Sequence, residues 1–207
     1  MATHGQKTFN GVAILAKRPF EAIIGLPGDP ADTQARYLEA VIPTDNGAVR
    51  LASIYLPNGN PAPGEKYSYK LAFLDRLIVH ARHLLKLEEK LALVGDFNVI
   101  PEPRDAAHPE QWLTDALFLP STRAKFRQLL ALGFTDAIRA TTDAAGLYTF
   151  WDYQAGAWQR NNGIRIDHIL LSPQAADRLG AAGVDKDLRA LDKPSDHTPV
   201  WAELAVE

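Results

Sequence analysis

Three short segments of the chain carry polar side chains whose types and spacing suit chemistry. Asp96 and Asn98 directly follow an apolar run, and a strand through both residues would place their side chains on one face. Asp167 lies in an otherwise apolar segment, where an unpaired carboxylate would be costly. Asp196 and His197 are neighbours in a proline-flanked loop before another apolar run. An Asp-His pair in that position is a candidate for acid/base catalysis or metal binding.

Each segment also has an ordinary structural explanation. Asp and Asn commonly end a strand and begin a turn, which would account for Asp96 and Asn98. Asp167 has a possible ion-pair partner in Arg165, two residues earlier on the same strand face. Tyr55, near the end of another apolar run, either presents its hydroxyl to a cleft or packs in the core. Taken together, these side chains at several strand ends suit a hard divalent cation and phosphate chemistry.

The composition excludes several classes of protein. Of the 207 residues, 46% are hydrophobic and 23% charged, which is typical of globular proteins and not of disordered or fibrous ones. There is no cysteine, so disulfides, thiolate metal sites and cysteine nucleophiles are excluded. Lys and Arg number 22 against 25 Asp and Glu, a net charge of -3, which excludes a uniformly basic surface for nucleic acid. A local basic groove stays open, with Lys66, Lys70 and Lys193 as candidates.

Neither a targeting nor a membrane segment is visible in the sequence. The first ten residues lack the apolar core of a signal peptide, and no window approaches 18 consecutive apolar residues. We therefore expect a cytoplasmic protein with no membrane partner. The oligomeric state stays open, with a monomer as our expectation.

The elements that must position these side chains follow from hydrophobic periodicity and turn signals. Asn46-Gly47 predicts a hairpin between two strands, and Gly133 predicts the end of a helix. Because strands dominate and helices stand between some of them, we predict one α/β sandwich domain spanning residues 1–207. The expected strands are 11–16, 36–42, 49–56, 91–94, 148–152, 165–171 and 198–204, and the expected helices are 65–87 and 122–132.

The order and wording of six segments identify a resemblance to a known family. HGQKTFNGVAIL, YLPNG, GDFNVIP, FWDY, NNGIRIDHILLS and KPSDHTPVWA occur here in that order. The chain resembles bacterial exodeoxyribonuclease III, the abasic-site endonucleases and 3′-exonucleases of the endonuclease/exonuclease/phosphatase superfamily, over residues 4–202. GDFN and SDH are shared across the superfamily, whereas HGQK, YLPNG, and GIRID with KPSDHTPVWA point to the exonuclease III branch.

The resemblance implies a fold and an activity. The implied fold is DNase I-like, a four-layer sandwich of two packed mixed β-sheets flanked by helices. The implied activity is hydrolysis of DNA phosphodiesters with Mg²⁺, or with Mn²⁺ in its place. The implied substrate is double-stranded DNA with abasic sites or free 3′ ends, as met in base-excision repair.

The resemblance also assigns catalytic roles to residues of this sequence. Asp96 and Asn98 match the pair that orients the attacking water and contacts the scissile phosphate. Tyr55 resembles the tyrosine that hydrogen-bonds that phosphate. His197 matches the active-site imidazole, and Asp167 matches the carboxylate that pairs with it.

Metal and substrate contacts are implied in the same way. Asp196 matches a carboxylate on the metal side of the site, where Asp96 and Asn98 would supply the other oxygen donors. Phe150, Ile164 and Ile166 fall where the family forms an apolar pocket for the base-less sugar. Ordinary core packing is an alternative for these three residues.

One part of the family pattern has no counterpart here. The family's N-terminal strand-helix-strand, with a Gln-Glu pair whose Glu is the principal metal ligand, is missing, and Glu21 and Glu39 lie in unrelated segments. We therefore expect reduced metal affinity and apolar surface where these strands would lie. Two alternatives remain: an inactive or weakly active DNA-binding fragment, and a superfamily phosphodiesterase acting on a different substrate.

Overall fold

The centre of the molecule is a six-stranded mixed sheet. The computed structural model describes residues 1–7 and 9–205, so Thr8 of the HGQK-containing segment lies outside the described residues. Strands β5 and β6 pair in parallel, and the other neighbours in this sheet pair antiparallel. In spatial order, the strands are β3 (Ala22–Ile24), β4 (Tyr37–Thr44), β5 (Gly47–Tyr55), β6 (Leu91–Asp96), β8 (Asp167–Leu171) and β7 (Thr135–Asp136).

The hairpin predicted around Asn46-Gly47 is confirmed as β4 and β5. Thr44 is the register partner of Gly47, so the two turn residues are Asp45 and Asn46, one position earlier than the predicted pair. Gly47 has a φ of 113°, a backbone conformation that glycine adopts without steric cost. Within β5, Ala52 and Ile54 are buried, whereas the residues of the opposite face are partly exposed.

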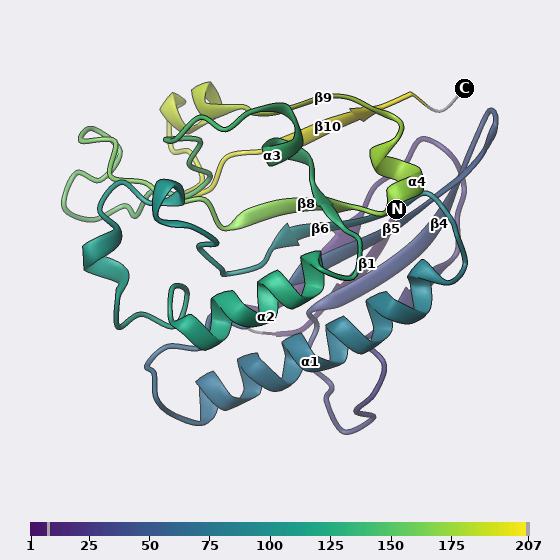
Figure 1. Ribbon diagram of the computed structural model, residues 1–207, viewed down its shortest axis with the longest axis horizontal. Helices are drawn as coiled ribbons and strands as arrows, with labels where there is room; N and C mark the ends of the chain where they lie inside the picture. The colour runs from purple at the N-terminus through teal and green to yellow at the C-terminus, as the bar shows by residue number, and fades with distance from the viewer. Residues whose placement is uncertain (8, 206–207) are drawn as a thin grey trace.

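One face of the sheet is covered by two helices, which lie side by side in Figure 1. They are α1 (Glu65–Leu85) and α2 (Pro120–Leu130). Phe73, Leu74 and Leu77 of α1 are at most 1% exposed and belong to one cluster with inward residues of β5 and β6. Both predicted helices are confirmed, with boundaries about two residues from those expected, which is ordinary for helix ends.

Two two-stranded sheets pack on the opposite face. The pair β1 (Ala2–Gly5) and β2 (Gly11–Ile14) lies against β4, and the pair β9 (Leu179–Val184) and β10 (Val200–Leu204) lies against β6 and β8. The predicted strands at 11–16 and 198–204 are thus confirmed, and so is the α/β class with sheet packed on sheet and helices outside. Within the described residues, the second layer consists of these two separate pairs.

Two strand predictions need correction. Residues 148–152 do not form a strand: Phe150 makes only isolated bridges, to Ile164 and to His197. The strand predicted at 165–171 begins at Asp167, because the backbone N–H of Arg165 donates to Asp105 and not to a neighbouring strand. The strands β1, β3, β7 and β9 were not expected. They are short, and β9, with the sequence LGAAGV, has few of the branched residues that signal a strand.

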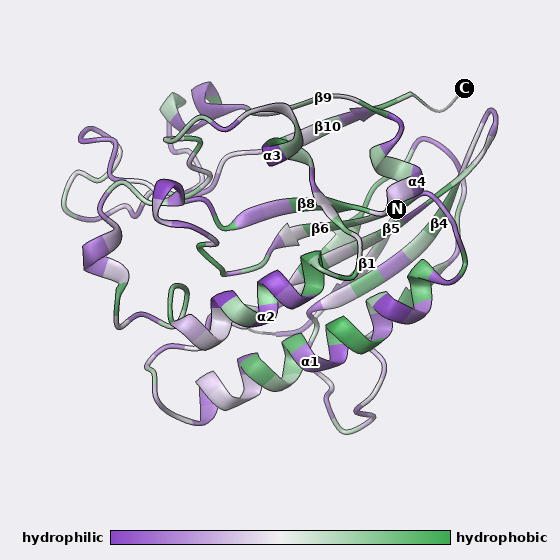
Figure 2. Cartoon of the chain, viewed as in Figure 1, coloured by the Kyte–Doolittle hydropathy of each residue, from purple (hydrophilic) through white to green (hydrophobic). Residues whose placement is uncertain are grey.

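Long connections collect at the edge of the sheet where β6 ends and β8 begins, at the left of Figure 1. Figure 2 shows β8 hydrophilic at this edge and hydrophobic farther along. The short helices α3 (Ala137–Thr141) and α4 (Pro173–Ala176) lie near β8. In the part of the chain that the structure describes, no helix is both long and apolar enough to cross a membrane.

Candidate active site

A row of three polar residues crosses this edge of the sheet. Tyr55 of β5 is the register partner of Asp96 of β6, and Asp96 is the register partner of Asp167 of β8. Register partners direct their side chains to the same face of a sheet. Ala92 and Ile169, which have the same parity as Asp96 and Asp167, pack against β9 and β10, so the row belongs to that face.

His197 extends the row from the loop before β10. Its Nδ1 lies 2.9 Å from Oδ2 of Asp167 and donates to it. Asp167 therefore has an imidazole as its partner, as the resemblance implied. The alternative ion pair between Asp167 and Arg165 is wrong, because Arg165 binds Asp105 and Asp136 on the other side of the strand.

Asn98 is folded back onto Asp96 by a turn after β6. Its backbone N–H donates to Oδ1 of Asp96 at 2.8 Å, and its Nδ2 donates to Oδ2 at 2.9 Å. Asn98 has a φ of 48°, a left-handed conformation that asparagine tolerates better than most residues. The two side chains do come together as predicted, but through this turn and not through strand alternation.

A glycine makes the approach of β6 to β5 possible. Gly95, directly before Asp96, has a φ of 133°, and a Cβ on it would lie 2.0 Å from the carbonyl oxygen of Ile54. Any other residue would push the end of β6 away from β5. The first position of the GDFN segment therefore sets how close Asp96 and Tyr55 lie across the sheet.

The charges around His197 and Asp96 shift both pKa values upward. Burial would lower the pKa of His197, but the hydrogen bond and charge of Asp167, with the charges of Asp96 and Asp196, outweigh it and raise the pKa to about 9. Burial and then the charge of Asp167 raise the pKa of Asp96 to about 7, against the opposing effects of His197, the Asn98 N–H and Lys70. At neutral pH the imidazole is thus held as a cation among carboxylates.

Tyr55 lines a hollow of about 460 Å³ at the end of the row away from His197. The guanidinium of Arg36 lies 5.0 Å from the centre of its ring. Asn58 and Lys66 also line this hollow, so Lys66, one of the candidate groove lysines, is an exposed residue close to Tyr55. Lys70 does not lie in a surface groove. It is 0% exposed, so the prediction that it contributes to such a groove is wrong. Lys193 is exposed in the loop that leads to His197.

The three predicted pocket residues divide into two groups. The Phe150 ring centre lies 5.0 Å from that of His197, and Phe150 and Ile164 line a hollow of about 280 Å³. Ile166 is 3% exposed and packs in a core cluster with Ile100 and Phe118. Core packing also applies to Ile164, which is 1% exposed and belongs to the same cluster, so of the three only Phe150 has a contact with the imidazole.

The donors available to a metal ion are few. Within residues 1–7 and 9–205, no group of three or more His, Asp or Glu side chains is arranged to hold a metal. Asp96 and Asp196 both act electrostatically on His197, and Asn98 Oδ1 accepts from Asn58 at 3.0 Å. These are all oxygen donors, and Mg²⁺ is commonly held by one or two carboxylates together with water and phosphate. By residue type these donors suit Mg²⁺, with the two aspartates as the charged members.

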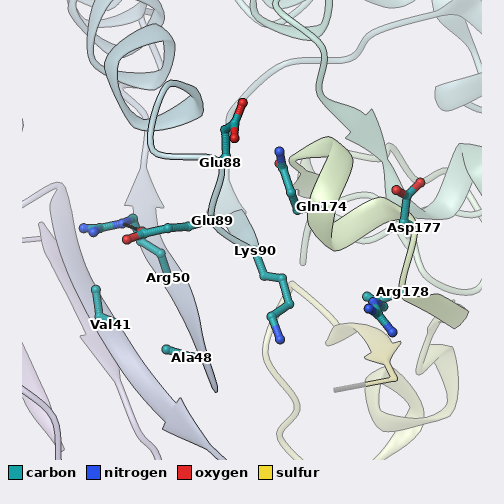
Figure 3. Close-up of a pocket in the computed structure, with 9 residues that line it drawn as sticks. All are labelled: Val41, Ala48, Arg50, Glu88, Glu89, Lys90, Gln174, Asp177 and Arg178. Atoms are coloured by element: carbon teal, nitrogen blue, oxygen red, sulfur yellow. Dashed lines mark hydrogen bonds and ion pairs between the residues drawn. The ribbon is translucent and has the colours of Figure 1, made fainter. Parts of the chain in front are cut away.

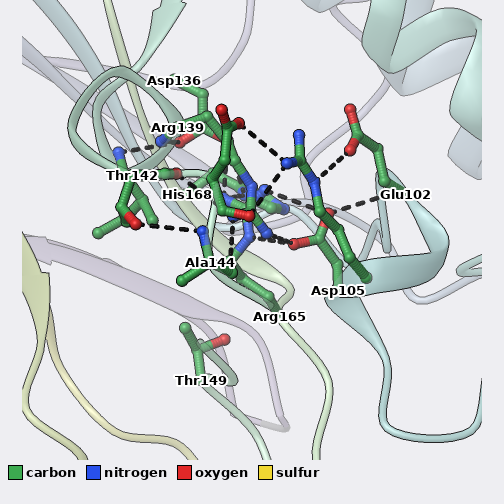
Figure 4. A network of polar contacts seen from close by, with 12 residues as sticks. Glu102, Asp105, Asp136, Arg139, Thr142, Ala144, Thr149, Arg165 and His168 are labelled. Atoms are coloured by element: carbon green, nitrogen blue, oxygen red, sulfur yellow. Dashed lines mark hydrogen bonds and ion pairs between the residues drawn. The ribbon is translucent and has the colours of Figure 1, made fainter. Parts of the chain in front are cut away.

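A buried ionic network lies behind the row, on the helix side of β8 (Figure 4). Arg165 is 1% exposed and binds Asp105 and Asp136, each at 2.7 Å, and Asp105 also pairs with Arg139. Arg165 also donates to Nδ1 of His168 at 3.1 Å. We did not foresee this network. Its signal in the sequence is an arginine within an otherwise apolar alternation.

Another hollow, of about 570 Å³, lies at the far end of β5 and β6 (Figure 3). Its lining includes Arg50, Glu89, Lys90 and Arg178. Arg50 is already paired with Glu39 and Glu89, and it lies at the opposite end of β5 from Tyr55. The shifted pKa values and the Asp167–His197 bond therefore mark the row, and not this hollow, as the candidate site.

Comparison with known proteins finds relatives over nearly the whole chain. Residues 2–197 match the model of the "Endonuclease/Exonuclease/phosphatase family". Exodeoxyribonuclease III of Haemophilus influenzae is 34% identical over 97% of this chain and 79% of its own length. A 3′-phosphatase from Neisseria, solved with a product DNA hairpin, superimposes with a TM-score of 0.91 at 38% identity, covering 99% of this chain and 78% of that one. An AP endonuclease from Archaeoglobus fulgidus gives a TM-score of 0.88 at 33% identity, with coverages of 98% and 78%.

Proposed function

From the premise that this chain belongs to the endonuclease/exonuclease/phosphatase family, and within it to the exodeoxyribonuclease III-type hydrolases, we propose that it hydrolyses DNA phosphodiesters with Mg²⁺. It would remove nucleotides from 3′ ends and cut 5′ to abasic sites, in base-excision repair. The observation that carries this proposal is the register row Tyr55–Asp96–Asp167 joined to His197. The names of its relatives, an exodeoxyribonuclease, a 3′-phosphatase and an AP endonuclease, support the same substrate class.

The row supplies groups that a phosphodiester needs. A phosphodiester is anionic, so attack by water requires positive charge at the phosphate oxygens and a base for the water. His197, held as a cation by Asp167, has its Nε2–H free of the Asp167 bond and would donate it to a phosphate oxygen. Asp96, whose pKa near 7 suits proton transfer at neutral pH, would orient the water and accept its proton. The Tyr55 hydroxyl would donate a further hydrogen bond to the phosphate.

A divalent cation would be held by Asp96, Asp196 and Asn98. When bound, Mg²⁺, or Mn²⁺ in its place, supplies positive charge next to the phosphate oxygens. The side-chain nitrogen of Asn98 already donates to Asp96 and to the carbonyl of Leu56, which fixes the orientation of its amide. In this proposal Asn98 acts mainly by holding Asp96 in place, and the two aspartates supply the charge.

The two hollows beside the row offer places for the rest of the substrate. The hollow lined by Phe150 and Ile164 also has polar residues in its lining and would take a sugar that lacks its base. The hollow at Tyr55, with Arg36 and Lys66 in its lining, would take the phosphate backbone on the other side.

The test is cleavage of a synthetic duplex with a tetrahydrofuran abasic analogue, assayed with Mg²⁺ and with EDTA. We expect metal-dependent incision on the 5′ side of the analogue. Duplexes with a recessed 3′-hydroxyl and with a 3′-phosphate report exonuclease and phosphatase activity at the same site. Failure to cut any of these duplexes in Mg²⁺ or Mn²⁺, by protein shown to be folded, would contradict the proposal.

The small number of metal donors favours a second candidate, a protein that binds DNA without cutting it. A salt-dependent mobility shift of the abasic duplex, with no product in the presence of metal, would support that candidate over the enzyme. A cytoplasmic location and a monomeric state are further proposals. Analytical ultracentrifugation tests the oligomeric state, and fractionation of cells tests the location.

A further inference from the structure

A buried lysine of α1 connects the two loops that carry the candidate site. Lys70 is 0% exposed, and its Nζ donates to the backbone carbonyl of Asn98 at 2.6 Å and to that of Asn58 at 2.9 Å. Asn58 follows β5, which ends at Tyr55, and Asn98 follows β6, which ends at Asp96. One ammonium group therefore bridges the loops that follow the two parallel strands.

The bridged loops are also bonded to each other. Nδ2 of Asn58 donates to Oδ1 of Asn98 at 3.0 Å, and Nδ2 of Asn98 donates to the carbonyl of Leu56 at 2.9 Å. Asn98 is thus held on its backbone by Lys70 and on its side chain by Asn58, Leu56 and Asp96. Its left-handed backbone is less favourable for a residue with a side chain and persists where the surroundings hold it.

The loop after β5 is shaped to leave room for this lysine. Gly59 has a φ of 93°, and a Cβ on it would lie 2.7 Å from Cδ of Lys70. The next residue, Asn60, donates to both carboxylate oxygens of Asp115, at 3.0 and 3.1 Å, which fixes the loop from its other side. The stem of Lys70 is enclosed by a loop that only a glycine at position 59 allows.

We propose that Lys70 is a positioning residue: by binding the carbonyls of Asn58 and Asn98 it fixes the spacing of the two loops, and thereby orients Asp96 relative to Tyr55 and the substrate phosphate. This inference rests on the proposed function. Because Lys70 is fully buried, it does not touch DNA. Its loss should therefore lower kcat and leave KM nearly unchanged. A displacement of a reacting group by about 1 Å costs up to about 100-fold in rate.

The test compares Lys70→Met with Leu84→Ala in steady-state kinetics on the abasic duplex. Leu84 is a buried residue near the other end of α1, 6% exposed, so its truncation destabilises the same helix far from the site. At a temperature where circular dichroism shows both variants folded, we expect kcat of Lys70→Met to fall by about 10- to 100-fold, with KM within about twofold. For Leu84→Ala we expect both constants to stay near wild type. Equal kcat in Lys70→Met and wild type, a change confined to KM, or an equal loss in Leu84→Ala would overturn the inference.

A second measurement does not depend on cleavage. In NMR spectra of protein with labelled asparagine, the side-chain amides of Asn58 and Asn98 should shift and exchange faster with water in Lys70→Met, and stay unchanged in Leu84→Ala. If Lys70→Met does not fold, Lys70→Arg replaces it, because the larger planar guanidinium does not fit this enclosed site without moving the two carbonyls. Wild-type amide signals and kcat in that variant would refute the inference. Inactive wild-type protein would instead contradict the proposed function, and the amide signals would still decide the role of Lys70.

Discussion

His197 and His168 lie on opposite sides of the same strand and have opposite charge behaviour. His197 binds Asp167, the first residue of β8, and three carboxylates raise its pKa to about 9. His168, the next residue along β8, is 1% exposed; burial and then the charge of Arg165 lower its pKa to about 4. Its Nδ1 accepts from Arg165 and its Nε2 donates to the carbonyl of Val99, which is the pattern of a neutral ring.

The difference between the two regions lies in how their carboxylates are paired. In the network behind β8, Asp105 and Asp136 each have an arginine, so the adjacent imidazole needs no charge. In the row, no arginine among the described residues acts on Asp96, and its pKa is raised toward neutrality. A surplus of carboxylate charge at a partly exposed edge, with shifted pKa values, is typical of functional sites.

Removing the imidazole of the row should have the largest effect on activity. We expect His197→Ala to lower cleavage of the abasic duplex by about 100- to 10,000-fold, the range typical of a lost acid/base group, while the fold is kept. The matched control is His108→Ala, an exposed histidine in another loop, which should cut at the wild-type rate. Near wild-type activity in folded His197→Ala would remove this residue from the site.

Removing the arginine of the buried network should affect stability instead. Arg165→Met takes a partner from both Asp105 and Asp136, and breaking a buried pair in this way costs about 3–5 kcal/mol of unfolding free energy. Urea unfolding measures this loss. Arg104→Ala, which breaks ion pairs on the surface, serves as the control and should leave the midpoint unchanged. A cost for Arg165→Met no larger than for this control would contradict the comparison.

The two histidines should give opposite pH dependences of stability. The folded state holds the extra proton on His197, so its contribution is present below pH 6.5 and is lost as pH rises through about 9. For His168 the unfolded state binds the proton more readily, so the contribution is present above pH 6.5 and is lost as pH falls through about 4. Ring resonances followed by NMR from about pH 2.5 to 10 measure both values. Titration of the two rings at a common pH near 6.5 would show that their surroundings do not differ as described.

The smallest effect is expected at the neutral member of the row. Tyr55→Phe removes one hydrogen bond to the phosphate anion, worth about 1.5–3 kcal/mol, so kcat should fall by about 10- to 100-fold. The matched control is Tyr153→Phe, a change at an exposed tyrosine whose hydroxyl bonds the carbonyl of Pro194. A loss for Tyr55→Phe as large as that for His197→Ala would mean that the hydroxyl does more than donate one bond.

The sequence predicted the members of the row better than their arrangement. Asp96, Asp167 and His197 were recognised from short segments, and the hydrogen bond between the last two is confirmed. That Tyr55, Asp96 and Asp167 stand in one row depends on β8 lying next to β6, a long-range pairing that no local spacing reveals. The strand expected at 148–152 failed for a similar reason, since its residues bridge to two segments that are distant in sequence and not to one neighbour.

The burial of Lys70 and Arg165 was not predicted, although the apolar residues around each of them in the sequence indicate it. Lys70 lies four and seven residues before Leu74 and Leu77, on the stripe of α1 that faces the sheet. A lysine on an apolar stripe must find acceptors inside the molecule, which is what Lys70 does. Arg165 stands between Ile164 and Ile166 with the same implication. Which acceptors such a residue finds depends on the tertiary fold.

The alternation along β8 also limits how this protein can change in length. Asp167 and His168 are neighbours in sequence, but Asp167 binds His197 and His168 accepts from Arg165 in the buried network. They are separated because successive side chains of a strand point to opposite faces of the sheet. One residue gained or lost just before Asp167 would turn the Asp167 side chain toward the helices and the His168 ring toward the candidate site. An insertion of two residues would return both side chains to their faces but would leave a bulge in the strand. Insertions and deletions should therefore accumulate in the connection at 152–162 and be absent between Ile164 and Leu171, where the alternation of β8 decides which side chains face the site.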